Sequence, residues 1–251
     1  MNSYDSSGAG DAFPKTRLSV LEAARSGKPG DREQALEALI AAYWKPLYKY
    51  VRLKFGKSPE DAQDLTQGFF IELMERDLLR RYEPAKSRLR TYLRVCMDSF
   101  ALNERRAAGR QKRGGAAPHV ALDFADAEGE LRGMVMDPEA IPAPETLDAY
   151  FEKEWIRHLF STAVEELRAL SLQRKKEQAF TLFERYDLDG DTASYAELAA
   201  ELDLPPTQVT NYLAWARREF RGLVLERLRA QSGSDEEFHR EAKSLFGGSE
   251  A

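Results

Sequence analysis

The spacing of the apolar residues is the feature of this sequence that most constrains its fold. From Leu36 to Phe55, apolar residues recur every three or four positions, which places them on one face of an α-helix. The same spacing returns in residues 58–81, 89–113 and 155–229. No stretch shows the alternation of apolar and polar residues that is typical of a half-buried strand. The sequence therefore predicts an all-α fold.

The first domain predicted from this spacing covers residues 31–115 and packs three helices. Pro46 lies inside the first helix and should kink it or divide it in two, because proline lacks a backbone donor. Ser58 before Pro59 is typical of a helix N-cap and should open the second helix, which should end near Arg81. The third helix runs from the next apolar stretch into a basic one, so three packed helices are expected.

The rest of the chain divides into a linker, a second helical domain and two polar ends. Residues 116–149 contain several prolines and no sustained period, and are predicted to be a flexible acidic linker. Residues 150–230 return to helical spacing and form the predicted second domain. Residues 231–251 are expected to be a polar, frayed tail with at most a short helix around Glu236–Phe246. Residues 1–30 are expected to be a flexible lead with a short helix.

Charge is strongly segregated along the chain, although the net charge is only −5. Residues 80–113, the basic segment, hold eleven Lys and Arg against three acidic residues, a net charge of +8. Residues 119–154, the acidic segment, hold ten acidic residues against two basic ones, a net charge of −8. The basic segment favours a polyanionic partner, although a charge run can also be a solvated helix face. The acidic segment should stay solvated and repel DNA.

Aromatic residues interleave with the arginines of the basic segment. Binding of separated, single-stranded bases requires cations for the phosphates and aromatic faces for stacking. Tyr92 and Phe100 lie on the apolar helix face and could be core residues, whereas Tyr82 is freer to stack. The pattern favours contact between this segment and opened DNA.

Residues 194–213 have the pattern of a helix-turn-helix, with a short capped helix, a tight turn and a second helix. Ser194 and Glu197 have the spacing of a capping box, and Pro206 should start the second helix. A helix lying in a major groove presents polar side chains to base edges and phosphates. The candidates are Thr207, Gln208, Thr210, Asn211, Arg217 and Arg218. The alternative is an ordinary helical hairpin.

Several kinds of chemistry find little support in the sequence. A single cysteine, Cys96, excludes an internal disulfide and a thiolate metal cage. No apolar run approaches the roughly 20 residues that cross a bilayer. Asp187-Leu-Asp-Gly-Asp resembles the start of a calcium loop, but the later glycine and glutamate of such a loop are missing. The histidines are scattered without ligand or triad spacing. We therefore expect a cytoplasmic protein that is not an enzyme and binds no cofactor or metal.

Three segments, in order, resemble sigma factors of the extracytoplasmic-function (ECF) type, which are bacterial transcription initiation factors. Asp61-Ala-Gln-Asp-Leu-Thr-Gln-Gly-Phe-Phe-Ile-Glu-Leu is similar to their polymerase-binding helix. Arg88-Leu-Arg-Thr-Tyr-Leu is similar to the start of their promoter-melting helix, and the helix-turn-helix to their second DNA-reading domain. The resemblance covers about residues 33–113 and 150–229, so residues 31–115 would be a region-two-like domain and residues 150–230 a region-four-like domain.

The resemblance also implies which residues bind each partner. Core RNA polymerase would contact Asp61, Asp64, Leu65, Gln67 and Phe70. Promoter melting and recognition of the start-proximal element would involve Tyr82, Lys86, Arg88, Arg90, Arg94, Arg105, Arg106, Arg110, Lys112 and Arg113. The upstream element would meet the six helix-turn-helix residues. The chain departs from the family at Gly68, where glutamate is usual, and at Asp98-Ser99, where Arg-Asn is common.

The function implied by the resemblance is to carry core RNA polymerase to promoters by recognising their −35 and −10 elements and aiding DNA melting. The partners would be core RNA polymerase, double-stranded promoter DNA and its opened non-template strand, with an anti-sigma factor as a further candidate and no membrane. The alternative is a stand-alone helix-turn-helix regulator, which would have no use for the surface from Asp64 to Phe70.

Overall fold

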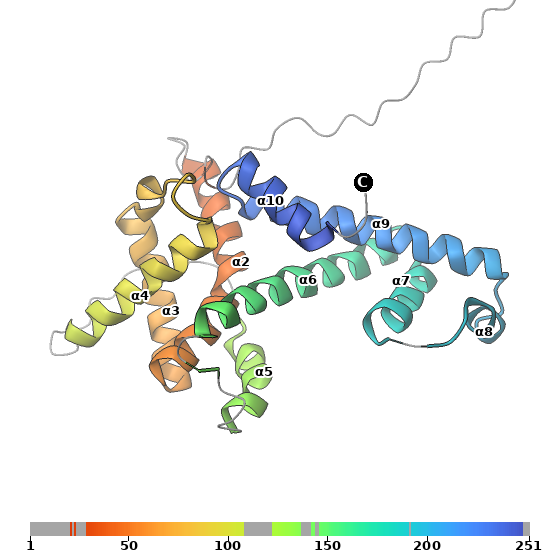
Figure 1. Ribbon diagram of the computed structural model, residues 1–251, viewed down its shortest axis with the longest axis horizontal. Helices are drawn as coiled ribbons and strands as arrows, with labels where there is room; N and C mark the ends of the chain where they lie inside the picture. Colours follow the sequence, from red (N-terminus) through yellow and green to blue (C-terminus); the bar gives the residue numbers. More distant parts are fainter. Residues whose placement is uncertain are drawn as a thin grey trace, which may run out of the picture.

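The computed structural model describes the chain over residues 29–107, 122–136, 142–143, 146–190 and 192–247, together with Leu21 and Ala23. Every regular element in these ranges is a helix, and no strand occurs there (Figure 1). The predicted all-α fold is confirmed. None of the helices in these ranges is long and apolar enough to cross a membrane. The predicted N-terminal lead lies almost entirely outside the described residues.

The predicted first domain contains helices α2 (Pro29–Phe55), α3 (Pro59–Glu75) and α4 (Leu89–Ala107), with the short 3-10 helix η1 (Leu78–Arg81) before α4. Helix α2 continues through Pro46, which is buried. The hydroxyl of Ser58 accepts a hydrogen bond from the backbone N–H of Asp61 at 3.1 Å and caps α3, as the sequence predicts. Helix α3 ends before the predicted Arg81, because Asp77 takes a left-handed conformation with φ of 51° that interrupts it.

Part of the predicted linker is folded, which differs from the expectation of a solvated segment without regular structure. Helix α5 (Phe124–Met136) lies in it and packs on α2. Phe124, Ala127 and Leu131 are buried in the core, because their spacing places them on one face of the helix. The acidic residues between them pair with cations of α2, which differs from the prediction that the segment stays solvated.

Two long helices, α6 (Leu147–Gln173) and α9 (Pro206–Gln231), run side by side through both halves of the molecule (Figure 1). The beginning of α6 and the end of α9 pack into the core formed by α2 to α5, the first core. The end of α6 and the beginning of α9 pack with α7 (Glu177–Phe183) and α8 (Tyr195–Glu201) in the second core. The predicted domain boundary at residue 150 therefore falls inside a continuous helix.

The chain returns to the first core in the predicted tail. Helix α10 (Asp235–Phe246) is capped by Ser234, whose hydroxyl accepts a hydrogen bond from Glu237 N–H at 3.2 Å. Figure 1 shows α10 folded back along α9, at the end of α9 that lies nearer to α4. The side chain of Phe238 is buried in the first core. The short helix expected in this region is thus present, but it is docked on the first domain.

Candidate functional site

The outer face of α3 is polar, and it is the surface that the resemblance assigns to polymerase. Asp61 and Asp64 are exposed and Gln67 is partly exposed. Leu65 and Phe70 belong to the first core, and Phe70 is 0% exposed with its ring 5.3 Å from that of Phe69. The prediction that Phe70 touches a partner is therefore corrected: its ring is a core side chain, as is most of Leu65. The accessible part of this surface consists of the three polar residues.

Gly68, where the resemblance would lead us to expect glutamate, packs closely against α4. A Cβ atom at this position would lie 3.1 Å from Cζ of Phe100, which is closer than ordinary van der Waals contact. The glycine thus lets α3 approach the ring of Phe100 on α4. A glutamate here would need that ring to shift.

Tyr82 does not have the freedom that the sequence analysis expected. It is 2% exposed, and its ring packs against that of Tyr92 with centroids 5.2 Å apart. Its hydroxyl oxygen lies 2.9 Å from the carbonyl oxygen of Ser87 and 3.1 Å from a carboxylate oxygen of Glu237, two acceptors that share its one hydrogen. In this conformation Tyr82 cannot stack on a base, contrary to the prediction, because Gly233 and Glu237 lie against its side chain.

The first arginines of α4 are paired with carboxylates. Arg90 is 4% exposed, forms ion pairs with Glu152 of α6 and with Glu241 of α10, the latter at 2.9 Å, and lies 4.4 Å from the ring centre of Trp155. Arg88 also pairs with Glu241, at 2.9 Å. Both residues are predicted to contact DNA; in this conformation Arg90 is buried, and Arg88 is paired while its side chain stays 39% exposed.

Further along α4, the cations are also engaged in internal contacts. Arg94 pairs with Asp148 of α6 at 2.6 Å. Asp98 accepts a hydrogen bond from the Tyr50 hydroxyl at 3.0 Å and pairs with Lys54 at 2.8 Å. Asp98, which stands where the resemblance would lead us to expect arginine, therefore links α4 to α2.

The remaining basic residues are exposed or fall outside the described part of the chain. Lys86 pairs with its neighbour Glu83 at 2.8 Å, and both side chains face solvent. Arg105 is exposed. The side chain of Arg106 and the residues Arg110, Lys112 and Arg113 lie outside the described residues. Of the described residues predicted to contact the promoter, Lys86 and Arg105 are exposed and Arg88 is partly exposed.

In the second core, the short helix α8 is followed by a turn and by the long helix α9. Ser194 and Glu197 form the capping box, and α9 begins at Pro206 after a turn in which Asp203 has φ of 53°. Thr207, Thr210 and Asn211 are exposed on the opening turns of α9. Gln208, which is partly buried, donates to the hydroxyl of Tyr212 at 2.7 Å.

The two arginines of α9 differ from each other. Arg217 pairs with Asp187 at 2.9 Å and donates to the Tyr195 hydroxyl at 3.3 Å, and the hydrogen bonding by Asp187 raises the pKa of Arg217. The side chain of Arg218 is 70% exposed and pairs with its neighbour Glu219 at 3.0 Å. Asp187, the first residue of the segment that resembles the start of a calcium loop, therefore forms an ion pair with Arg217. The described residues contain no cluster that could hold a metal ion.

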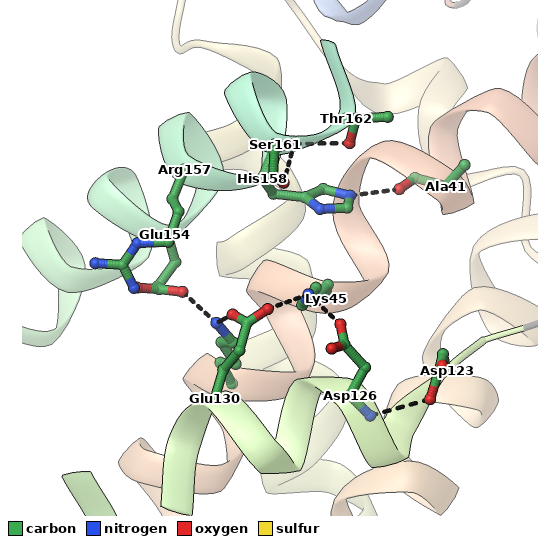
Figure 2. Close-up of polar contacts among 11 residues, drawn as sticks. Ala41, Lys45, Asp123, Asp126, Glu130, Glu154, Arg157, His158, Ser161 and Thr162 are labelled. Atoms are coloured by element: carbon green, nitrogen blue, oxygen red, sulfur yellow. Dashed lines mark hydrogen bonds and ion pairs between the residues drawn. The ribbon is translucent and has the colours of Figure 1, made fainter. Parts of the chain in front are cut away.

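An ion-pair network that the sequence analysis missed joins α2, α5 and α6 (Figure 2). Lys49 lies 2.6 Å from Glu154 of α6 and also pairs with Glu130 of α5. Lys45 pairs with Glu130 and, at 2.6 Å, with Asp126. The signal that could have revealed it is the complementary charge of α2 and the acidic segment at helical spacing.

A neighbouring ion pair extends the contact between α2 and α5. Arg52 donates to the carboxylate of Glu128 at 2.9 Å, and this hydrogen bonding holds the pKa of Glu128 below its usual range. The Tyr48 hydroxyl donates to the same carboxylate at 2.8 Å. The acidic segment therefore neutralises cations of the first domain.

Residues 39–111 match the family model of sigma-70 region 2. The match spans α2 from Leu39, α3, η1 and α4, so it coincides with most of the predicted first domain. It supports a sigma factor with a role in transcription initiation, and region 2 implies binding to core RNA polymerase and promoter DNA. No curated protein and no solved structure matches the chain.

Proposed function

We propose that this chain is a cytoplasmic sigma factor of the ECF type, which binds core RNA polymerase and directs it to promoters through their −35 and −10 elements. The observation that carries the proposal is the match of residues 39–111 to sigma-70 region 2. The exposed polar face of α3, with Asp61, Asp64 and Gln67, supports a polymerase contact in this segment. The protein would contribute binding energy and no catalysis of its own.

The basic segment and helix α9 would bind different promoter elements. The basic segment would bind the opened strand of the start-proximal element, and its cations would make the binding depend on salt. The opening turns of α9 would read the upstream element, because Thr207, Thr210 and Asn211 are exposed side chains of the type that contacts base edges. Arg218 would contact a phosphate. Contacts with polymerase and both elements add, which lets an acidic protein act on DNA.

The alternative is a stand-alone DNA-binding regulator. Such a protein would use α8 and α9 in the same way but would need no polymerase surface on α3. The region 2 match favours the sigma factor, because that match lies wholly outside α8 and α9.

Co-purification with core RNA polymerase tests the proposal. The double variant Asp61→Arg/Asp64→Arg reverses two charges on the exposed face of α3 and should lose polymerase while keeping its helical circular dichroism. The matched control is Glu33→Arg/Glu37→Arg, which reverses two exposed charges on α2. Polymerase retained equally by the wild type and both variants would contradict the assignment of this face.

A further inference from the structure

Helix α10 places a carboxylate at the start of α4. Glu237 is 3% exposed and accepts hydrogen bonds from Leu89 N–H at 2.9 Å and from Gly233 N–H at 2.8 Å, in addition to that from the Tyr82 hydroxyl. Leu89 is the first residue of α4, and the first N–H groups of a helix have no partner within the helix. An anion at this point is stabilised by hydrogen bonds and by the helix dipole.

A second carboxylate of α10 lies one turn later and neutralises the arginines that follow. Glu241 is 3% exposed and lies 2.9 Å from both Arg88 and Arg90. Carboxylates and phosphates use the same donors of a guanidinium group. While Glu241 is docked, Arg90 is committed to carboxylates, and Arg88, whose side chain is 39% exposed, has an anion beside it that would repel a phosphate.

The backbone before α10 fits closely over Tyr82. A Cβ atom on Gly233 would lie 2.4 Å from Cε1 and 2.6 Å from the hydroxyl oxygen of Tyr82. The glycine is therefore required for the closed arrangement, because any side chain at position 233 would collide with a buried ring. Gly233, Glu237 and Glu241 thus all contact residues 82–90, which we name the 82–90 segment.

Helix α10 is also an element that can detach. It has 12 residues, and isolated helices of about 12–15 residues or fewer are only marginally stable in water. Its place depends on contacts with the rest of the molecule, which include Phe238, the two glutamates, and Phe246 against the ring of Phe160. Its release would return Tyr82, Arg88 and the N-terminus of α4 to solvent, while Arg90 would keep its pair with Glu152.

We propose that α10 is an internal competitor of nucleic acid: docked, it closes the 82–90 segment, and it must leave before that segment can bind opened promoter DNA. The inference rests on the proposed function, because it takes the 82–90 segment as the surface that binds the −10 element. Helix α10 competes with the DNA backbone because its carboxylates, Glu237 and Glu241, lie where phosphates would otherwise bind. The described structure is thus the closed state of the protein.

Binding of the full chain to a fluorescent duplex with an unpaired central bubble, measured by anisotropy without polymerase, tests this. Glu237→Gln/Glu241→Gln removes the two charges, and Gly233→Ala forces α10 away from Tyr82 without a change in charge. Glu165→Gln/Glu177→Gln removes two exposed charges away from α10, and Gly222→Ala adds a methyl group where no atom lies within 4 Å. These two variants are the matched controls.

Both release variants, and their combination, should bind the bubble more tightly than the wild type, and the controls should not. If about one tenth of the molecules are open, release tightens binding about tenfold. Hydrogen exchange should show that residues 235–246 lose protection in the release variants. Unchanged affinity in the combined variant overturns the inference, whether α10 has lost its protection or has kept it.

The result is separable from that for the proposed function. If the wild type and all variants bind core polymerase and the bubble equally, only the inference about α10 fails. If none of them binds polymerase, the proposed function fails.

Discussion

Replacing Lys49 by Met should lower the free energy of unfolding by about 3–5 kcal/mol, because removing one partner of a buried ion pair strands the other charge. The side chains of Lys49 and Glu154 are each only 3% exposed and lie 2.6 Å apart. The remaining partner of Glu154, Arg157, is 64% exposed, so solvent screens that contact, which offsets at most about 1 kcal/mol. For a chain of this size, the loss corresponds to a fall in Tm of about 6–20 °C.

The assay is guanidinium denaturation followed by circular dichroism. The double variant Lys49→Met/Glu154→Leu should recover most of the lost stability, because it buries no unpaired charge at this point. Lys86→Met is the control, since its pair with Glu83 is exposed and should contribute less than about 1 kcal/mol. The reasoning is refuted if Lys49→Met is as mild as Lys86→Met, or if the double variant is as unstable as the single one.

Three further predictions concern Phe70, His158 and two polar residues of α9. Phe70→Ala should destabilise the fold by about 3–5 kcal/mol in urea titration, because it empties a fully buried position; a folded variant that loses only polymerase would show Phe70 to be a contact after all. Burial lowers the pKa of His158, so stability should be intact above about pH 6.5 and fall as the pH drops below it, and His158→Gln should flatten this fall in thermal melts; an unchanged slope would contradict it. Binding-site selection should show Asn211→Ala relaxing base preference at the upstream element, whereas Arg217→Ala, which releases Asp187, should weaken binding to all sequences alike; the reverse pattern would exchange their roles.

Features set by local sequence were predictable. The Ser58 cap and the capping box of Ser194 and Glu197 each depend on residues three positions apart, and the structure has both. Contacts between distant segments were not predictable in this way. Tyr82 looked free because its partner Glu237 lies 155 positions further on.

The acidic segment shows the same limit in another form. Its composition suggested a solvated linker, because charge and proline count against a packed helix. The cations that neutralise it lie about 80 positions earlier on α2, at Lys45 and Arg52, so the charge count of the segment alone missed them. Hence the helical class could be predicted, whereas the docking of α5 and α10 could not.

Run-off transcription with purified core RNA polymerase tests the central claim most directly. A mixed library of promoter-length fragments is transcribed with polymerase alone, with the wild-type chain added, and with Asp61→Arg/Asp64→Arg added. Discrete transcripts that depend on the wild-type chain, share sequence elements upstream of their starts, and vanish with the double variant are the predicted result. Transcripts that are the same with and without the chain, although the chain binds DNA in the same buffer, would contradict a sigma factor and favour the stand-alone regulator.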